Sequence, residues 1–168
     1  MRSALSIDID APGNLVFALA RDVMRWPALL PHYRDVRVLE RHADGSTTAR
    51  MLAIRTVVPP LGYGVPVAWR ARVWVDPPTL GLRFRHLGGA TNGMDVSWRI
   101  EPGDGGCRVT IEHVFEPRVP AWAAFVDALF VRPIAGRTLA TFKSIAESAA
   151  AASQEARSTR RRPAKKSA

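Results

Sequence analysis

Apolar and polar residues alternate with period two along much of the chain between residues 66 and 115. In Pro66–Asp76 the odd-numbered side chains are apolar or aromatic, and the even-numbered ones include two arginines. This alternation is typical of a half-buried strand, because successive side chains point to opposite faces of a sheet. The same pattern recurs in Leu80–Leu87, Met94–Ile100 and Cys107–Phe115. Gly, Asn and Pro separate the four segments, which therefore predict consecutive strands of an antiparallel sheet.

Three further strands are predicted nearer the N-terminus, at Leu5–Ile9, Tyr33–Arg41 and Ser46–Val57. Asp44-Gly45 joins the last two, and this dipeptide favours the tight turn of a hairpin. Two short helices are expected between the first and second strands. One begins at Pro12, where proline suits the first helical turn, and the other covers Val23–Leu30.

The C-terminal part of the chain has helical spacing. Pro120–Val131 begins a helical segment, and Pro133 is expected to kink or restart the helix because it lacks a backbone N–H. From Ile134 to Ala149 apolar residues form one stripe, which needs an apolar surface to cover it. The concave face of the sheet is the expected surface. Residues 153–168 are small and basic without periodicity, and we predict a disordered tail after a domain of residues 1–152.

The net charge of +9 is concentrated at the C-terminus. Removing the six Lys and Arg residues that lie between positions 157 and 166 leaves +3 for residues 1–156. An RNA, ribosome or anionic lipid partner is therefore expected to contact the tail, if it binds by charge. The single Cys107 excludes an internal disulfide and suits a reducing cytoplasm. No signal peptide is expected, and the apolar run Val119–Val131 is shorter than the ~20 residues of a membrane span.

Two features leave alternatives open. Val58–Val65 predicts a loop with an apolar tip at Leu61 and Tyr63, which could cover an opening or simply pack down. The alternation in Ser46–Val57 does not decide whether Arg55 lines the interior or stands outside.

The predicted order of strand, two short helices, further antiparallel strands and a long final helix resembles the helix-grip fold of the START-like, or SRPBCC, superfamily. This α+β fold has a curved antiparallel sheet of about six or seven strands wrapped around the C-terminal helix. The resemblance implies a ligand cavity between sheet and helix. The likeness is greatest to the polyketide cyclase/dehydrase branch, which includes aromatase/cyclases. The stretches that carry it are Ile9-Asp10-Ala11-Pro12, Val16-Phe17, Asp22 through Trp26-Pro27 to Tyr33, Met94-Asp95-Val96-Ser97-Trp98, and Gly105-Gly106 leading to Phe115.

The chain departs from that branch in one strand. Aromatase/cyclases carry a Trp-x-Trp-x-Ser-x-Arg pattern whose inward Ser and Arg are proposed polar contacts for a poly-β-ketone chain. The matching positions here are Val67, Trp69, Ala71 and Val73. Arg70 and Arg72 lie on the opposite face, and only a one-residue slip would turn them inward.

The resemblance and the strand pattern together predict the site residues. Tyr33 matches the family's cavity tyrosine, and His113 falls where the family places a polar inward side chain, so these two are the candidate catalytic groups. The expected ligand-binding residues are Trp69, Phe84, His86, Met94, Trp98, Ile111 and Phe142. His32 and His42, at loop or strand ends, are expected to face solvent. No histidine pair has metal-ligand spacing, so we predict no metal and no cofactor.

The leading functional hypothesis is a cytoplasmic protein that binds one apolar, aromatic or polycyclic molecule, since aromatic walls offer flat polarizable area. If the protein is an enzyme, the expected reaction is cofactor-independent cyclisation or dehydration of a polyketide-like chain, with His113 or Tyr33 moving a proton. The alternative is a non-catalytic carrier of lipid or quinone, or a protein that associates with ribosomes or membranes.

Overall fold

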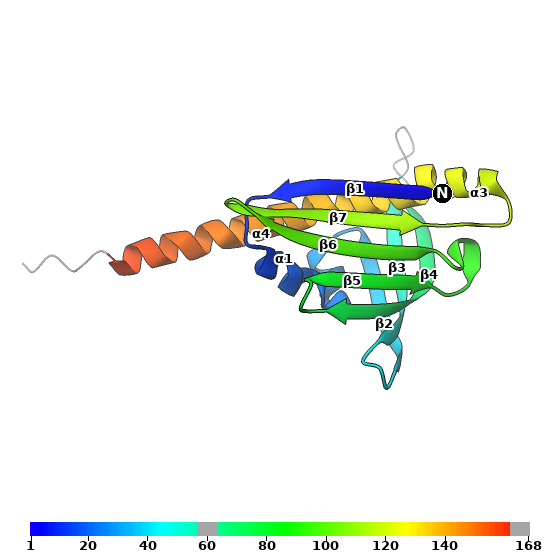
Figure 1. Cartoon of the computed structure of the whole chain (residues 1–168), viewed down its shortest axis with the longest axis horizontal. Helices are drawn as coiled ribbons and strands as arrows, with labels where there is room; N and C mark the ends of the chain where they lie inside the picture. The colour runs from blue at the N-terminus through cyan, green and yellow to red at the C-terminus, as the bar shows by residue number, and fades with distance from the viewer. Residues whose placement is uncertain (57–63, 162–168) are drawn as a thin grey trace, which may run out of the picture.

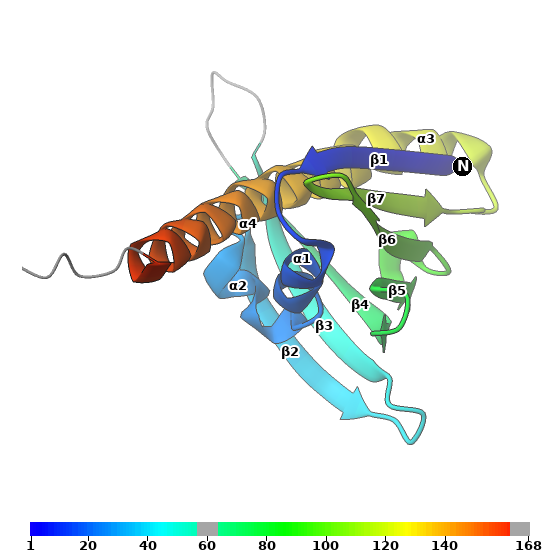
Figure 2. The same ribbon diagram turned by 60° about the vertical axis from the view of Figure 1, so that its left-hand side comes forward.

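Seven antiparallel strands form one curved sheet in the computed structural model, which describes residues 1–56 and 64–161 (Figures 1 and 2). In chain order the strands are β1 (Arg2–Ile9), β2 (Tyr33–Arg41), β3 (Thr47–Thr56), β4 (Gly64–Asp76), β5 (Gly81–His86), β6 (Asp95–Gly103) and β7 (Gly106–Val114). Their order in the sheet is β1-β7-β6-β5-β4-β3-β2. Only β1 leaves the sequential order, since it pairs with β7 rather than with β2.

Helices cover the concave face of this sheet. They are α1 (Gly13–Ala20), the 3-10 turn η1 (Val23–Arg25), α2 (Trp26–Leu29), the 3-10 turn η2 (Gly89–Thr91), α3 (Pro120–Val126), the π-helical turn η3 (Asp127–Val131) and α4 (Arg132–Arg161). The long α4 runs beside β1, α1 packs against α4, β6 and β7, and α2 packs against β2 (Figure 2). This arrangement confirms the expected helix-grip fold. No helix in the described ranges combines the length and apolarity that crossing a bilayer requires.

The predicted strand faces are confirmed in β4. Ala71 and Val73 are buried and Trp69 is half-buried on the concave side, whereas Arg70 and Arg72 alternate with them on the convex side. The register therefore follows the apolar pattern, because a one-residue slip would expose the whole apolar set. The Asp44-Gly45 hairpin is also present, with Gly45 at a φ of 78° and the Ser46 amide donating to Asp44 Oδ1 at 3.0 Å.

The helix interruption expected at Pro133 takes the form of a π-helical turn. The chain stays helical from α3 through η3 into α4, and Pro133 is the second residue of α4. Proline cannot donate to the carbonyl four residues earlier, and a wider turn just before it accommodates the unmatched group. This turn places both Phe130 and Val131 on the cavity that is described below.

The predicted tail boundary at residue 153 is wrong, because α4 continues to Arg161. Residues 151–159 are exposed, and in Figure 1 this end of α4 projects beyond the sheet. Ala, Gln, Glu and Arg are strong helix formers, and adding one residue to an anchored helix costs far less than nucleating a new one. Residues 162–168 and the loop tip at Leu61 and Tyr63 lie outside the described residues, so contact of the tail with an anionic surface stays a prediction.

Candidate ligand-binding site

A cavity of about 340 Å³ lies between the concave face of the sheet and the helical segment from η3 into α4. Its wall is mostly apolar and aromatic. Six of the seven predicted ligand-binding residues line it, namely Trp69, Phe84, His86, Met94, Trp98 and Ile111. Both predicted catalytic residues, Tyr33 and His113, also line it. The strand alternation thus brings these side chains to one place, although their roles stay predictions.

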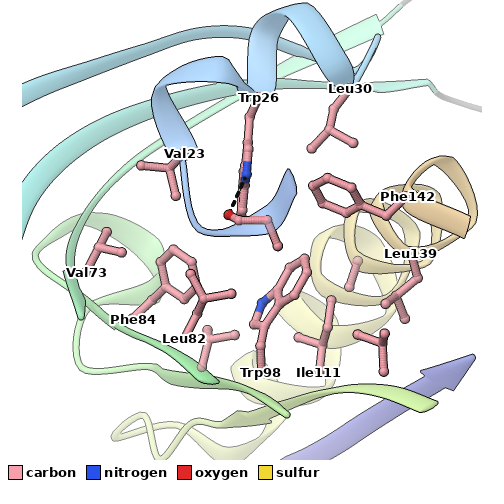
Figure 3. Close-up of a cluster of buried hydrophobic side chains, with 14 of the residues drawn as sticks. Val23, Trp26, Leu30, Val73, Leu82, Phe84, Trp98, Ile111, Leu139 and Phe142 are labelled. Atoms are coloured by element: carbon pink, nitrogen blue, oxygen red, sulfur yellow. Dashed lines mark hydrogen bonds between the residues drawn. The ribbon is translucent and has the colours of Figure 1, made fainter. Parts of the chain in front are cut away.

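Phe142, the seventh predicted residue, does not line the cavity. Its side chain is buried in the solid part of the core, with its ring edge-on to Trp98 at 5.9 Å and to Trp26 at 6.2 Å between centroids. Figure 3 shows it between α4 and α2. The hollow ends one helical turn earlier on α4, at Thr138, because Trp26 and the short helices fill the remaining space.

Trp26 is the largest residue of the site that the sequence did not predict. Its ring centroid lies 5.0 Å from that of Tyr33, 5.7 Å from that of Trp98 and 5.9 Å from that of Phe84. The indole N–H donates to the carbonyl oxygen of Ala20 at 3.0 Å (Figure 3). In the sequence, Trp26-Pro27 marks only a helix boundary. The short length of the helix could have indicated this position. A helix of four residues has little stability of its own, so its one large side chain is expected to pack into the core.

A polar cluster joins β2 to α4 at one side of the cavity. Thr138 Oγ1 lies 2.9 Å from His32 Nε2 and 2.9 Å from the carbonyl oxygen of Ile134, and it also bonds the Tyr33 hydroxyl. The expectation that His32 faces solvent is wrong, since its side chain is buried against α4. His42 is half-buried, with Nε2 at 2.8 Å from Thr48 Oγ1. The partner of His42 lies across the same hairpin, whereas that of His32 lies on the distant α4, which local sequence does not reveal.

The geometry fixes the hydrogen-bond roles in this cluster. A hydroxyl has one hydrogen and a carbonyl can only accept, so Thr138 donates to Ile134. His32 Nε2 then donates to Thr138. Burial raises the pKa of Tyr33 well above its usual value, so the side chain stays a neutral phenol. A neutral phenol at the cavity wall can donate a hydrogen bond to a ligand or accept one from it.

Two histidines form the second polar part of the cavity wall. His86 stacks on Trp69, with 5.9 Å between centroids and 17° between planes, and its Nδ1 lies 2.8 Å from Thr91 Oγ1. Burial lowers the pKa of His86 to about 3, and the neighbouring His113 acts in the same direction. Burial also lowers the pKa of His113 to about 4, although Asp127 opposes this shift. Both imidazoles are thus neutral at neutral pH.

His113 retains unused hydrogen-bonding capacity. Within residues 1–56 and 64–161, its buried Nδ1 has no hydrogen-bond partner. A buried polar atom without a partner costs free energy, on the order of 1–3 kcal/mol. This nitrogen is fully buried, so a ligand in the cavity would reach it only after the imidazole ring turned.

The mouth of the cavity is formed by four lining residues that are exposed to solvent. These are Val65, Pro66 and Ala68 at the start of β4, and Ala90 in η2. Arg55 stands nearby on the concave side, in alternation with the buried Met51 and Ala53, and its guanidinium carbon lies 6.0 Å from the Phe130 ring centroid. The strand pattern did not decide which face Arg55 occupies, and the structure places it on the inner face, near the rim of the cavity.

A hydrogen bond ties the rim to α3. The indole N–H of Trp122 donates to the Ala90 carbonyl oxygen at 2.9 Å, and the Trp122 ring stacks on Phe125 at 5.2 Å between centroids. The turn that holds Ala90 is bounded by Gly88, Gly89 and Gly93, all with positive φ. Glycine adopts this conformation without strain, and the Trp122 bond holds the turn against α3.

Comparison with known proteins gives one consistent family. Residues 9–142 match the family model described as polyketide cyclase/dehydrase and lipid transport. The chain is 29% identical to a Streptomyces cyaneus protein that carries the name polyketide cyclase, over 68% of this chain and 73% of that protein. The fold is similar to that of the ZhuI aromatase/cyclase from a Streptomyces species, with a TM-score of 0.72 at 19% identity over 88% and 93% of the two chains. It is also similar to a START superfamily protein from Mycobacterium smegmatis, with a TM-score of 0.61 at 17% identity over 89% and 96%.

Proposed function

Because the chain belongs to the polyketide cyclase/dehydrase and lipid transport family, we propose that it binds one compact, ring-containing apolar molecule in the cavity beneath α4. The observation that carries this proposal is the hollow itself, which has aromatic walls and polar groups at two places. Its volume of about 340 Å³ is at the low end of small-molecule sites, which favours a compact ring system over a long acyl chain. A cytoplasmic setting suits the free, buried Cys107 thiol.

The polar groups specify the ligand further. Trp69 and Trp98 offer flat surfaces to a ring, and Tyr33 and His113 offer hydrogen bonds at separate positions of the wall. A polar substituent near His113 would meet a neutral imidazole at the cavity wall, and a hydroxyl near Tyr33 could donate to the phenol oxygen. We therefore propose a ring compound with at least one hydroxyl or ketone group.

Filling the cavity should weaken the binding of a fluorescent apolar probe. Ala135 is buried, lines the cavity and lies on α4, so Ala135→Phe would place a ring in the space. We expect anilinonaphthalene sulfonate to bind the variant at least ~10-fold more weakly, which corresponds to about 1.4 kcal/mol. Ala140→Phe, on the exposed side of the same helix, is the matched control and should bind the probe like the wild type. A thermal melt verifies that both variants fold. Unchanged binding by folded Ala135→Phe would exclude the cavity as the site.

A second candidate function is proton-transfer catalysis, which the neutral imidazole of His113 at the cavity wall favours. A neutral imidazole could accept a proton from the carbon beside a ketone, and loss of a β-hydroxyl group as water would follow. Ala71 and Val73 offer no polar group at the inward positions of β4, so this chemistry would depend on His113.

A chromogenic β-hydroxy ketone tests the catalytic candidate. Turnover should be constant above pH ~5 and decrease as the pH falls through about 4, where His113 becomes protonated. His113→Phe should lose turnover but still bind the probe. Binding without turnover in the wild type would leave the carrier function and exclude catalysis of this reaction.

A further inference from the structure

The convex face of the sheet, opposite the cavity, carries a cluster of arginines. It consists of Arg37 on β2, Arg50 on β3, Arg70 and Arg72 on β4, and Arg83 and Arg85 on β5. These six residues are called the arginine band below. All but the half-buried Arg72 are exposed, and their strand neighbours, such as Ala71 and Phe84, are buried on the concave side. The four strands are consecutive in the sheet, so the band is continuous.

The strand register places like charges directly opposite one another. Arg37 pairs with Arg50, and Arg50 pairs with Arg70, so three guanidinium groups follow one row across three strands. On the next row Arg72 pairs with Arg85. Like charges at directly opposed positions destabilise a sheet, by a few tenths of a kcal/mol to about 1 kcal/mol for each pair. Asp35 lies within reach of both Arg37 and Arg50, so carboxylates of the fold offset part of this repulsion, and an external anion could offset the remainder.

Carboxylates neutralise only part of the band. Asp35 contacts Arg37 at 2.9 Å, Asp44 contacts Arg72 at 2.9 Å, and Asp95 contacts Arg85. Three carboxylates thus face six guanidinium groups. In residues 1–56 and 64–161, neither Arg70 nor Arg83 has a carboxylate within 4.0 Å. The six arginines and their three carboxylate partners together carry a charge of +3.

An aromatic ring lies within the band. Trp74 is half-buried on the convex side of β4, and the guanidinium carbons of Arg72 and Arg83 lie 5.2 Å and 5.6 Å from its ring centroid. Guanidinium planes and aromatic rings are the two surfaces on which unpaired nucleobases stack. The band therefore combines positive charge for a phosphate backbone with flat groups for bases.

We propose that the arginine band binds single-stranded RNA, with phosphates along the Arg50–Arg70 row and a base stacked beside Trp74. The curvature of the sheet favours this ligand. A flat bilayer would meet a convex surface over a small area, and duplex nucleic acid is stiff over about 150 base pairs. A flexible single strand can follow the surface. This activity would be separate from the cavity, since the band and the cavity lie on opposite faces of the sheet.

The test compares two double variants of the full chain, so that the basic C-terminal residues are present in both. Arg70→Gln/Arg83→Gln removes the two band arginines that have no carboxylate partner. Arg21→Gln/Arg25→Gln removes the same charge from exposed positions at α1 and η1. Binding of a labelled oligo-uridine of roughly twelve nucleotides, within the range for single-strand sites, is measured by fluorescence anisotropy at several salt concentrations.

The wild type should bind the oligo-uridine, and the band variant should bind at least ~10-fold more weakly, with a salt slope lower by about 1.4 for two lost phosphate contacts. The control variant should keep the wild-type slope. Trp74→Leu should weaken binding without changing the salt slope, because stacking releases no counterions. All variants should bind the cavity probe normally.

Several results would overturn the proposal. Equal weakening by both double variants would assign binding to net charge rather than to the band. The same variants are also tested with a DNA oligomer of the same length and with phosphatidylserine vesicles. Tighter binding of the wild type to DNA than to RNA would assign the band to DNA. Loss of vesicle binding by the band variant, with its RNA binding unchanged, would assign the band to a lipid surface. Absence of oligo-uridine binding by the wild type at low salt would also exclude it.

Discussion

Lowering the pH from about 7 to about 5 should lower the free energy of unfolding by about 5 kcal/mol, because three histidines are buried in neutral form. Burial lowers the pKa of His32 and of His113 to about 4 each, and that of His86 to about 3. The native state therefore binds fewer protons than the unfolded chain between pH ~6.5 and pH ~4. Stability decreases as the pH is lowered wherever the unfolded chain binds more protons than the native state, and each histidine contributes about 2 kcal/mol to this decrease at pH 5.

Urea denaturation at the two pH values measures this effect. His86→Gln removes one titrating group, so its loss of stability between the two pH values should be smaller than that of the wild type by about 2 kcal/mol. Val96→Ala is the matched control, because it weakens the same cavity wall without removing a titrating group. It should be less stable at both pH values, with the wild-type difference between them. Equal pH dependence in all three proteins would contradict the burial of neutral imidazoles.

Replacing Trp26 by alanine should lower the free energy of unfolding by about 3–5 kcal/mol, the range for removal of a buried aromatic ring. Its side chain is 2% exposed, and it contacts rings from the sheet and from α4 together. Its loss would separate α2 from both layers and enlarge the cavity. Urea denaturation measures the change, and a domain with a typical stability of 5–15 kcal/mol would lose much of it.

Trp26→Phe separates the two contributions of this residue. It keeps an aromatic ring but removes the donor to the Ala20 carbonyl oxygen, so about 1–3 kcal/mol should be lost. Leu39→Ala, at an exposed position on β2, is a control that should change stability by about 0.5 kcal/mol or less. A loss below about 1 kcal/mol for Trp26→Ala would contradict its place at the centre of the core.

The strand pattern predicted the sheet and most of the cavity wall because strand periodicity is a local property. Once Trp69 faces inward, the period of two places Ala71 and Val73 beside it and puts Arg70 on the other face. The same reasoning brought His86 and His113 to one side of the sheet. Spacing alone did not show which histidine would have a partner and which would not.

Contacts between distant segments decided the features that the strand pattern did not predict, namely the burial of His32 and the position of Phe142 outside the cavity. The partner of His32 is Thr138, which is 106 residues away, so no local pattern could indicate that this histidine is buried. Whether Phe142 reached the cavity depended on how far α2 extends across the concave face, and Trp26 occupies that space.

The sequence by itself determined which residues face inward and that a long helix closes the sheet, because apolar periodicity sets the buried face of each element separately. Only the tertiary structure decided where the interior is solid and where it is hollow, and it also set which like-charged arginines oppose one another across the strands. Both depend on the registers and packing of elements far apart in the chain, and periodicity within one element contains no information about the position of another.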